Sequence, residues 1–155
     1  MNWQEVTENP NLQNLPFKIE LNEWGQIVMN PVKLGHSMYQ GEIAHLMRIM
    51  RDDGFASPEV AIWTKKGTKV ADVAWISDKL WKKLKGKAEA DIAPEICVKV
   101  VSMSNSDAEM KQKRKLYFEQ GANEVWICDE YGDLVFYNSN GKTKKSKMNE
   151  TARTF

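Results

Sequence analysis

The segment from Ile96 to Val101, Ile-Cys-Val-Lys-Val-Val, constrains the fold more than any other part of the chain. It is nearly continuously apolar, which is typical of a strand buried on both faces inside a sheet. The segment therefore predicts a central strand with other layers packed against it. Lys99 stands in the middle of this strand, where an unpaired ammonium group would be costly. We therefore expect an acid close to Lys99.

The rest of the apolar pattern predicts strands and helices around this central strand. Phe17 to Leu21 alternates apolar and polar residues and turn residues follow, so a hairpin is expected over 17–29. Ser106 and Glu109 form the pattern of a capping box, which predicts a helix that ends before Gly121. Further helices are expected over 36–51 and 78–86, and further strands over 60–63, 70–76, 125–128 and 134–137. This order favours an α/β (α+β) fold, with a central mixed β-sheet flanked by helices.

Length and composition set further limits. The 155 residues, 42% of them hydrophobic, suit a single domain, expected over 1–138, with a polar, lysine-rich tail over 139–155. No apolar run approaches the roughly 18 residues of a membrane span, and the N-terminus lacks the pattern of a signal peptide. Cys97 and Cys128 lie in apolar, strand-like segments, which indicates buried free thiols and a cytoplasmic protein.

The formal net charge of +1 conceals a division of the chain. The first 60 residues carry more acids than bases. The remainder is basic, with lysine clusters at 65–69, 79–87, 111–115 and 142–147. Clustered lysines suit a phosphate-backbone ligand such as DNA, and they equally suit a solvated surface.

Three charged residues on the predicted strands are candidates for chemistry. Asp72 lies in the otherwise apolar segment from Val70 to Ile76, where aspartate is disfavoured, so it is either hydrogen-bonded structurally or a metal ligand. Glu95 and Lys99 share one face of the next strand and lie about 13 Å apart along it, so they cannot both touch one metal ion. Lys99 is expected to pair with Asp72.

Phosphodiester hydrolysis needs an activated water and positive charge near the developing phosphorane oxygens. A magnesium ion held by carboxylates supplies both, and a nearby lysine can orient the water or stabilise charge. Lys113 is a candidate for that lysine, because it follows the central strand on a helix and shares a helix face with Tyr117. A surface lysine paired with Glu109 is the simpler interpretation.

Three blocks of sequence stand in a distinctive order. They are Val70-Ala71-Asp72-Val73-Ala74, then Ala93 to Ser104 (APEICVKVVSMS), then Lys113-Arg114-Lys115-Leu116-Tyr117 followed by Gln120 to Asp129. Together they resemble the Uma-two family of restriction endonucleases, a branch of the PD-(D/E)XK nuclease superfamily. The N-terminal part fits the family more loosely, with an early hairpin, Pro31, and His36 opening a helix.

The resemblance implies a restriction-endonuclease-like core and an endonuclease that uses Mg²⁺ or Mn²⁺ to cleave DNA, with a homodimer as the expected assembly. It implies Asp72 as a metal ligand, with Glu95 as a second candidate, and Lys113 as the catalytic lysine beside Tyr117. The family's glutamate falls on Lys99, where an ammonium group would occupy or repel the metal position. Metal binding is therefore expected to be weakened, or absent if Lys99 blocks the site.

Three hypotheses follow. The chain is a magnesium-dependent DNA endonuclease with a site at Asp72, Lys99, Lys113 and Tyr117, or a nuclease fold without efficient catalysis that binds nucleic acid, or an interaction domain with no nucleic-acid role. Metal-dependent cleavage separates the first from the others. Salt-sensitive DNA binding separates the second from the third.

Overall fold

The structure is a computed structural model, and it describes residues 1–102 and 105–149. A six-stranded sheet in the order β3-β4-β5-β6-β7-β8 forms its centre, and β1 and β2 form a separate hairpin. The strands are β1 (Phe17–Leu21), β2 (Ile27–Pro31), β3 (Gly54–Thr64), β4 (Gly67–Ser77), β5 (Ile96–Val100), β6 (Glu124–Cys128), β7 (Leu134–Asn138) and β8 (Gly141–Thr143). The helices are α1 (Trp3–Glu8), α2 (Leu34–Met50), α3 (Asp78–Leu84) and α4 (Asp107–Glu119), with short 3₁₀ turns at Pro10–Leu12 and Lys147–Asn149.

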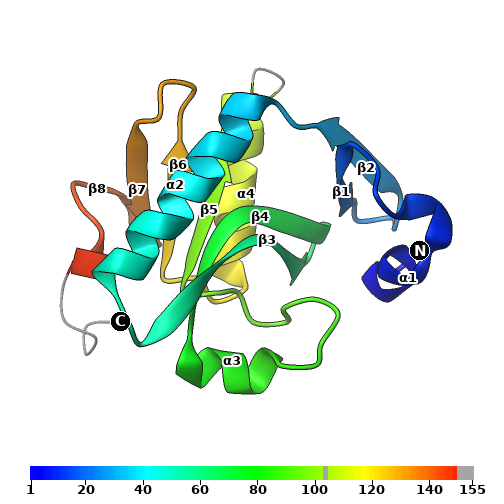
Figure 1. Ribbon diagram of the computed structural model, residues 1–155, viewed down its shortest axis with the longest axis horizontal. Coiled ribbons are helices and arrows are strands. Elements are labelled where there is room, and N and C mark those ends of the chain that lie inside the picture. The colour runs from blue at the N-terminus through cyan, green and yellow to red at the C-terminus, as the bar shows by residue number, and fades with distance from the viewer. Residues whose placement is uncertain (103–104, 150–155) are drawn as a thin grey trace.

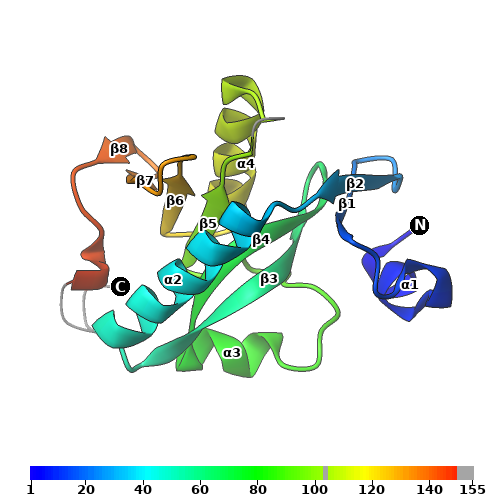
Figure 2. The same ribbon diagram turned by 45° about the horizontal axis from the view of Figure 1, so that its top comes forward.

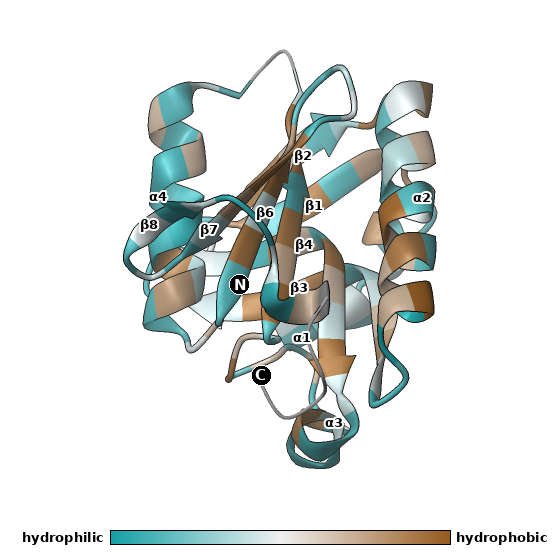
Figure 3. Cartoon of the chain, turned by 90° about the vertical axis from the view of Figure 1, so that its left-hand side faces the viewer, coloured by the Kyte–Doolittle hydropathy of each residue, from teal (hydrophilic) through white to brown (hydrophobic). Residues whose placement is uncertain are grey.

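The large sheet is mixed and is covered on both faces. β5 and β6 pair in parallel, and the other neighbouring strands pair antiparallel. The helix α2 crosses one face of the sheet and α4 lies against the other (Figure 1). Coloured by hydropathy, the strands form an apolar layer between these two helices (Figure 3). A parallel pair buried between two helices explains why the segment from Ile96 to Val100 is apolar on both sides.

Alternate residues of β5 serve two different cores. Ile96, Val98 and Val100 pack with buried residues of α2 in one cluster, and Cys97 packs with Tyr117 of α4 in the other. Lys99 has the same strand parity as Cys97, so its side chain belongs to the α4 side. Because alternate residues of β5 face opposite sides of the sheet, Lys99, the one charged residue of this strand, lies on the side of α4.

The hairpin of β1 and β2 stands beside the open end of the sheet, with α1 outermost (Figures 1 and 2). It docks on the turn between β3 and β4. Gly67, with φ +95°, lies so close that an added Cβ would be 2.3 Å from the carbonyl oxygens of Leu21 and Asn22. Lys69 Nζ donates to the Leu21 carbonyl at 3.2 Å. Any side chain at position 67 would therefore disturb the docking that holds the hairpin in place.

Most of the predicted elements are confirmed, with boundaries shifted by a few residues. The central mixed sheet, the early hairpin and the helices over 36–51, 78–86 and after Ser106 are all present. Ser106 accepts a hydrogen bond from the Glu109 amide at 3.2 Å, as an N-cap does. Cys97 and Cys128 are free and buried. Among the described residues no helix is both long and apolar enough to cross a membrane.

The polar tail departs from expectation over 141–149. β8 pairs with β7, and Met148 is fully buried in the α2-side core. The buried Glu124 carboxylate also accepts the Lys147 amide at 3.2 Å. One apolar anchor and one amide contact thus order a segment whose composition looks solvated. Met103, Ser104 and residues 150–155, which belong to the predicted strand exit and tail, lie outside the described residues.

Candidate active site

Charged and polar side chains from five elements meet around Asp72 in the middle of β4. Lys18 and Glu20 come from β1, His36 and Gln40 from α2, Glu59 from β3, Lys99 from β5, and Lys113 from α4. We call this set, with Asp72, the Asp72 cluster. It lies at the end of the sheet where the hairpin docks, and its bonded members are up to 93 residues apart in sequence.

The β-ladders on both sides of β4 are interrupted at Asp72, which explains how a charged residue is accommodated there. β3 pairs with β4 at Pro58 and again at Val60, but Glu59 between them has a left-handed φ of 53°. The Asp72 carbonyl accepts instead from Gln40 Nε2 at 2.6 Å, and the same nitrogen donates to Glu59 Oε1 at 2.6 Å. Side chains thus replace the missing ladder bonds.

On the opposite side, the β4–β5 ladder runs from Trp75 to Val73 and stops before Asp72. The Asp72 carboxylate takes over, because Oδ2 accepts the Val100 amide at 2.7 Å. The aspartate is therefore a structural bridge between the two strands. This role and a role in chemistry are compatible, since only one of its oxygens makes the bridge.

Three cationic or protonatable groups surround the fully buried Asp72 carboxylate. Lys18 Nζ donates to Oδ1, while Lys99 Nζ lies 3.5 Å and His36 Nε2 lies 3.4 Å from Oδ2. Burial alone would raise the pKa of the Asp72 carboxyl, but these three neighbours hold it well below its ordinary value. Asp72 is therefore a carboxylate anion, and the predicted pairing with Lys99 is present.

The two lysines on Asp72 are in different electrostatic positions. Burial lowers the pKa of Lys99 to about 8, because the attraction of Asp72 is partly offset by Lys18 and Lys113 nearby. Burial acts on Lys18 as well, but Asp72, Glu20 and Glu59 outweigh it and raise its pKa. The charged form of Lys18 is therefore favoured as the counter-ion of Asp72, whereas the charged form of Lys99 is destabilised by its burial.

Glu20 and Lys113 form a second buried pair in the cluster. Lys113 Nζ is 2.9 Å from Glu20 Oε1, and the Val70 amide donates to Glu20 Oε2 at 2.6 Å. Burial would raise the pKa of the Glu20 carboxyl, and Lys113 and Lys18 lower it below its usual value. Lys113 thus points into the cluster as the resemblance implied, and its partner is Glu20 instead of Glu109.

Tyr117, one helical turn after Lys113, is fully buried beside the cluster. Its hydroxyl has no hydrogen-bond partner among the residues that the structure describes. Burial and the nearby Glu20 raise the pKa of the Tyr117 hydroxyl well above its ordinary value. Tyr117 is therefore a neutral phenol at the floor of the cluster.

Glu95 is not part of this cluster. Its carboxylate accepts the Ser77 amide at 3.0 Å and the Ser77 hydroxyl at 2.7 Å, at the far end of β4. Ser77 is in turn the N-cap of α3. Five residues of extended strand separate Ser77 from Asp72, about 16 Å. In this arrangement Glu95 and Asp72 cannot ligate the same ion.

Sequence reasoning missed the contributions of Lys18, Glu20, Gln40 and Glu59. The alternation of β1 predicts the wrong buried face, because Lys18 is 8% exposed while the neighbouring Phe17 is 44% exposed. Alternation marks the two faces of a strand, but here the polar face is the buried one. The sequence indicates His36 only as the opening of a helix. The residue type of Glu59 gives no indication of its positive φ.

The donors in the Asp72 cluster do not fit a magnesium ion in this arrangement. Magnesium needs carboxylate oxygens that face it, with water and phosphate completing an octahedron. Both oxygens of Asp72 and both oxygens of Glu20 are taken by ammonium or amide donors. Within the described part of the chain, no three His, Cys, Asp or Glu residues are grouped so that they could hold a metal ion.

Comparisons with known proteins identify the fold and the family of this chain. A crystal structure of a putative nuclease belonging to DUF820, from Anabaena variabilis ATCC 29413, matches 89% of this chain and 79% of its own, with a TM-score of 0.68 and 17% sequence identity. That likeness shows a shared nuclease fold. A search of curated proteins finds no match. The model of the family Uma2, described as "Putative restriction endonuclease", matches residues 3–152. Because that match spans nearly the whole chain, the chain belongs to the Uma2 family, as its resemblance in three blocks around Asp72 predicted.

Proposed function

We propose that this chain is a nuclease-family domain that binds nucleic acid without a divalent metal and does not cleave it efficiently. One observation carries the proposal. The carboxylate of Asp72 already has an ammonium group on Oδ1 and a second ammonium group 3.5 Å from Oδ2. A divalent cation there would have to displace or tolerate two positive charges.

The charges of the cluster support this reading. Three carboxylates (Asp72, Glu20 and Glu59) face three ammonium groups (Lys18, Lys99 and Lys113). Replacing Lys99 by glutamate, the residue that the family resemblance places there, would change the local charge by two units. Lys99 is therefore the position at which one substitution would change the charge around Asp72 most, although Lys18 would remain on Oδ1.

Other lysines, outside the cluster, give the domain a means to hold a phosphate backbone. Lys111 and Lys115 are exposed on α4, and Lys142 and Lys144 are exposed in and just after the edge strand β8. Lysines that neutralise phosphates release condensed counter-ions, so binding of this kind weakens steeply with salt. The family's association with nucleic acid makes DNA the first ligand to test.

The test is fluorescence anisotropy of a labelled DNA duplex in EDTA, over about 50 to 200 mM salt. We expect binding without metal and a steep, linear fall of log affinity with log salt. Magnesium added in excess of the EDTA should not strengthen binding. Absence of salt-sensitive binding in EDTA would overturn the proposal.

Family membership itself favours a second candidate, a magnesium-dependent DNA endonuclease. Plasmid cleavage with Mg²⁺ or Mn²⁺ decides between the two, using the native chain, Lys99→Glu and Asp72→Ala. Cutting by the native chain that is lost in Asp72→Ala supports the endonuclease. Cutting by Lys99→Glu alone supports a scaffold whose catalysis is blocked by one ammonium group.

A further inference from the structure

Arg114 of α4 lies over the aromatic ring of Tyr137 of β7. Its guanidinium carbon is 4.0 Å from the centroid of the ring, which is the range of a cation–π contact. Within the described residues, no carboxylate pairs with Arg114 and its guanidinium donates no hydrogen bond. The ring thus holds the guanidinium in place while its N–H donors remain without a protein acceptor.

Exposed lysines continue the positive charge on both sides of this contact. Lys111 lies one helical turn before Arg114, on the same face of α4. Lys142 of β8 is the register partner of Tyr137, and opposite residues of an antiparallel pair lie on one face of the sheet. Lys144 follows two residues later. We call this set the basic strip: Lys111, Arg114, Tyr137, Lys142 and Lys144.

The basic strip runs from α4 across the edge of the sheet. Figure 3 looks onto this side of the molecule, where β8 and β7 lie next to α4. Lys142 and Lys144 line a shallow hollow of about 520 Å³ over the residues of β7 that lie beyond the end of β8. A ligand on the strip would therefore meet an open surface, with positive charge along its length.

The acids of α4 leave most of this charge uncompensated. Glu119 is already shared between Lys65 and Lys115, and Glu109 accepts from the amide of Asn105. Asp107 lies two turns before Arg114, at the first residue of the helix. In the described part of the chain, the three lysines of the basic strip form no ion pair. The strip therefore presents four cationic side chains that no carboxylate neutralises.

A positioned arginine between unpaired lysines matches a row of phosphates. Guanidinium donors fit phosphate oxygens in pairs, and lysines act as point charges beside them. We infer that the basic strip is the surface on which the domain binds the phosphate backbone of DNA, with Arg114 as the central contact and Tyr137 as the residue that positions it. This inference rests on the proposed nucleic-acid binding and adds its location. The strip includes no member of the Asp72 cluster.

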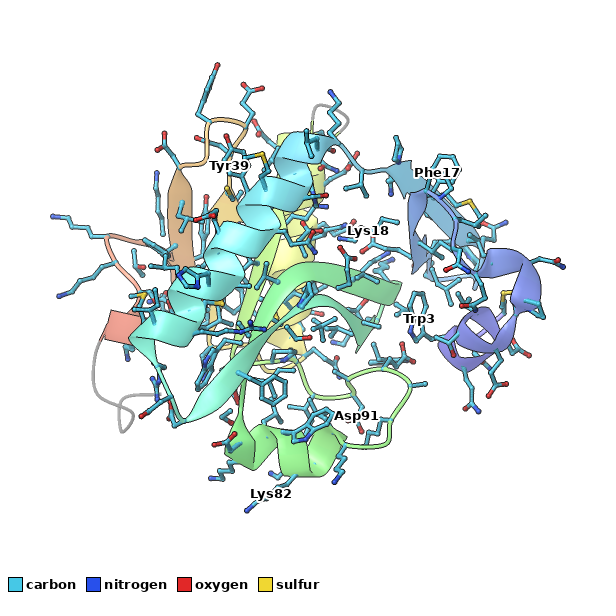
Figure 4. All side chains as sticks on the ribbon, in the orientation of Figure 1. Trp3, Phe17, Lys18, Tyr39, Lys82 and Asp91 are labelled. Carbon is cyan, nitrogen blue, oxygen red and sulfur yellow. The ribbon has the colours of Figure 1, made fainter. Side chains whose placement is uncertain are left out.

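The first test compares two variants with the same change in net charge. One variant replaces the four bases of the strip: Lys111→Gln, Arg114→Gln, Lys142→Gln and Lys144→Gln. The control replaces four exposed lysines in and just after α3: Lys79→Gln, Lys82→Gln, Lys83→Gln and Lys85→Gln. Figure 4 shows Lys82 at the lower edge of the molecule, away from β7 and β8.

The readout is anisotropy of a labelled duplex in EDTA over a range of salt. Each phosphate contact contributes about 0.9 to the slope of log affinity against log salt. The strip variant is therefore expected to lose about 3 to 4 from this slope, and the α3 control less than about 1. Urea unfolding of both variants checks that they are folded.

The second test leaves every charge in place. Tyr137→Leu removes the ring under Arg114, whereas Tyr137→Phe keeps the ring and removes only the hydroxyl. Tyr137→Leu is expected to weaken duplex binding about two- to fivefold, the range of an exposed cation–π contact. Tyr137→Phe should bind as the native protein does.

The outcomes separate this inference from the proposed function. Salt-sensitive binding by the native protein whose slope falls equally in the strip variant and the α3 control overturns the basic strip and leaves nucleic-acid binding intact. Absence of binding by the native protein overturns both. Equal binding by Tyr137→Leu and Tyr137→Phe overturns the positioning of Arg114. A slope lost only in the strip variant, with weaker binding by Tyr137→Leu alone, supports the inference in full.

Discussion

Two acidic residues that lie beyond opposite ends of the β4–β5 ladder have very different surroundings. Asp72 is fully buried in β4, and its carboxylate meets Lys18, Lys99, His36 and a backbone amide from three separate elements. Glu95 precedes β5 and is only partly buried, and its carboxylate meets the amide and hydroxyl of a single residue, Ser77. Asp72 is surrounded by charged groups from distant segments, whereas Glu95 contacts only the N-cap residue of α3.

This difference shows what separates a candidate site from a polar contact. Both acids are rich in hydrogen bonds, so the number of bonds does not distinguish them. The distinguishing property is charge that must be compensated by charge, because a buried ion without a partner is costly. Substitutions at residues of the two sites test whether buried charge is what distinguishes them.

Asp72→Asn should destabilise the protein most. The substitution keeps the volume of the side chain and an acceptor for Val100, but it leaves Lys18 and Lys99 without their anion. Removing one partner from a buried ion pair costs about 3–5 kcal/mol. Urea denaturation at pH 7 measures the effect. A loss below about 1 kcal/mol would mean that the cluster is hydrated and that the contrast with Glu95 is not electrostatic.

Lys99→Met should stabilise the protein, and the gain should depend on pH. Burial lowers the pKa of Lys99 from 10.5 to about 8. Below pH 8 this lysine is charged in both the folded and unfolded chain, so the cost of burying the charge is fully present. Between pH 8 and 10.5 the folded chain releases the proton while the unfolded chain retains it, so the cost disappears as pH rises.

The gain of Lys99→Met is therefore expected to be at most roughly 3 kcal/mol near pH 7 and to shrink between pH 8 and 10.5. Native and variant unfolding free energies, measured across this range, give the difference directly and cancel the titration of other groups. Lys82→Met, on the exposed side of α3, is the control and should show no such trend. A gain that is constant with pH would indicate packing, with no contribution from charge.

Glu20→Gln tests the second buried pair of the cluster. The change removes the charge opposite Lys113 and weakens the acceptor for the Val70 amide. Hydrogen bonds to charged groups contribute about 1.5–3 kcal/mol, so a loss in this range is expected in urea denaturation. Glu23→Gln is the matched control, because its partner Lys66 is 49% exposed and such pairs contribute about 1 kcal/mol or less. Equal losses for the two variants would contradict the importance given to burial.

Glu95→Gln should have the smallest effect. The amide oxygen of glutamine can still accept from Ser77, and no buried cation loses its partner. A loss of about 1 kcal/mol or less is expected. The helix cap at Ser77 should survive, which amide hydrogen exchange at the start of α3 can follow. A loss as large as that of Asp72→Asn would show that buried charge does not distinguish Asp72 from Glu95.

The sequence predicts the sheet and its helices well because local patterns govern them. Ile96 to Val100 had to be central, and the cap at Ser106 had to start a helix. It also predicts that Lys99 needs Asp72, since a lysine in an apolar strand requires an acid nearby. The placement of Lys113 facing inward came from the family resemblance, and helix periodicity alone left it at the surface.

The rest of the site could not be predicted, for reasons that are physical. Lys18 and Glu20 occupy the buried face of β1 only because the hairpin docks with that face against β4, and docking is a tertiary event. Glu59 depends on a left-handed backbone that any polar residue can adopt at some cost. The order of residues 141–149 depends on a single methionine reaching the core.

The docking of the hairpin against Gly67 has a consequence for the order of folding. Lys18 and Asp72 are 54 residues apart and Glu20 and Lys113 are 93 apart, so the cluster closes two long loops. Loop closure of this length adds an entropic barrier, and a two-stranded hairpin has little stability of its own. The hairpin therefore joins late and leaves first. Its opening releases Lys18 and Glu20 together, so the cluster disassembles as a unit while the sheet beneath it remains folded.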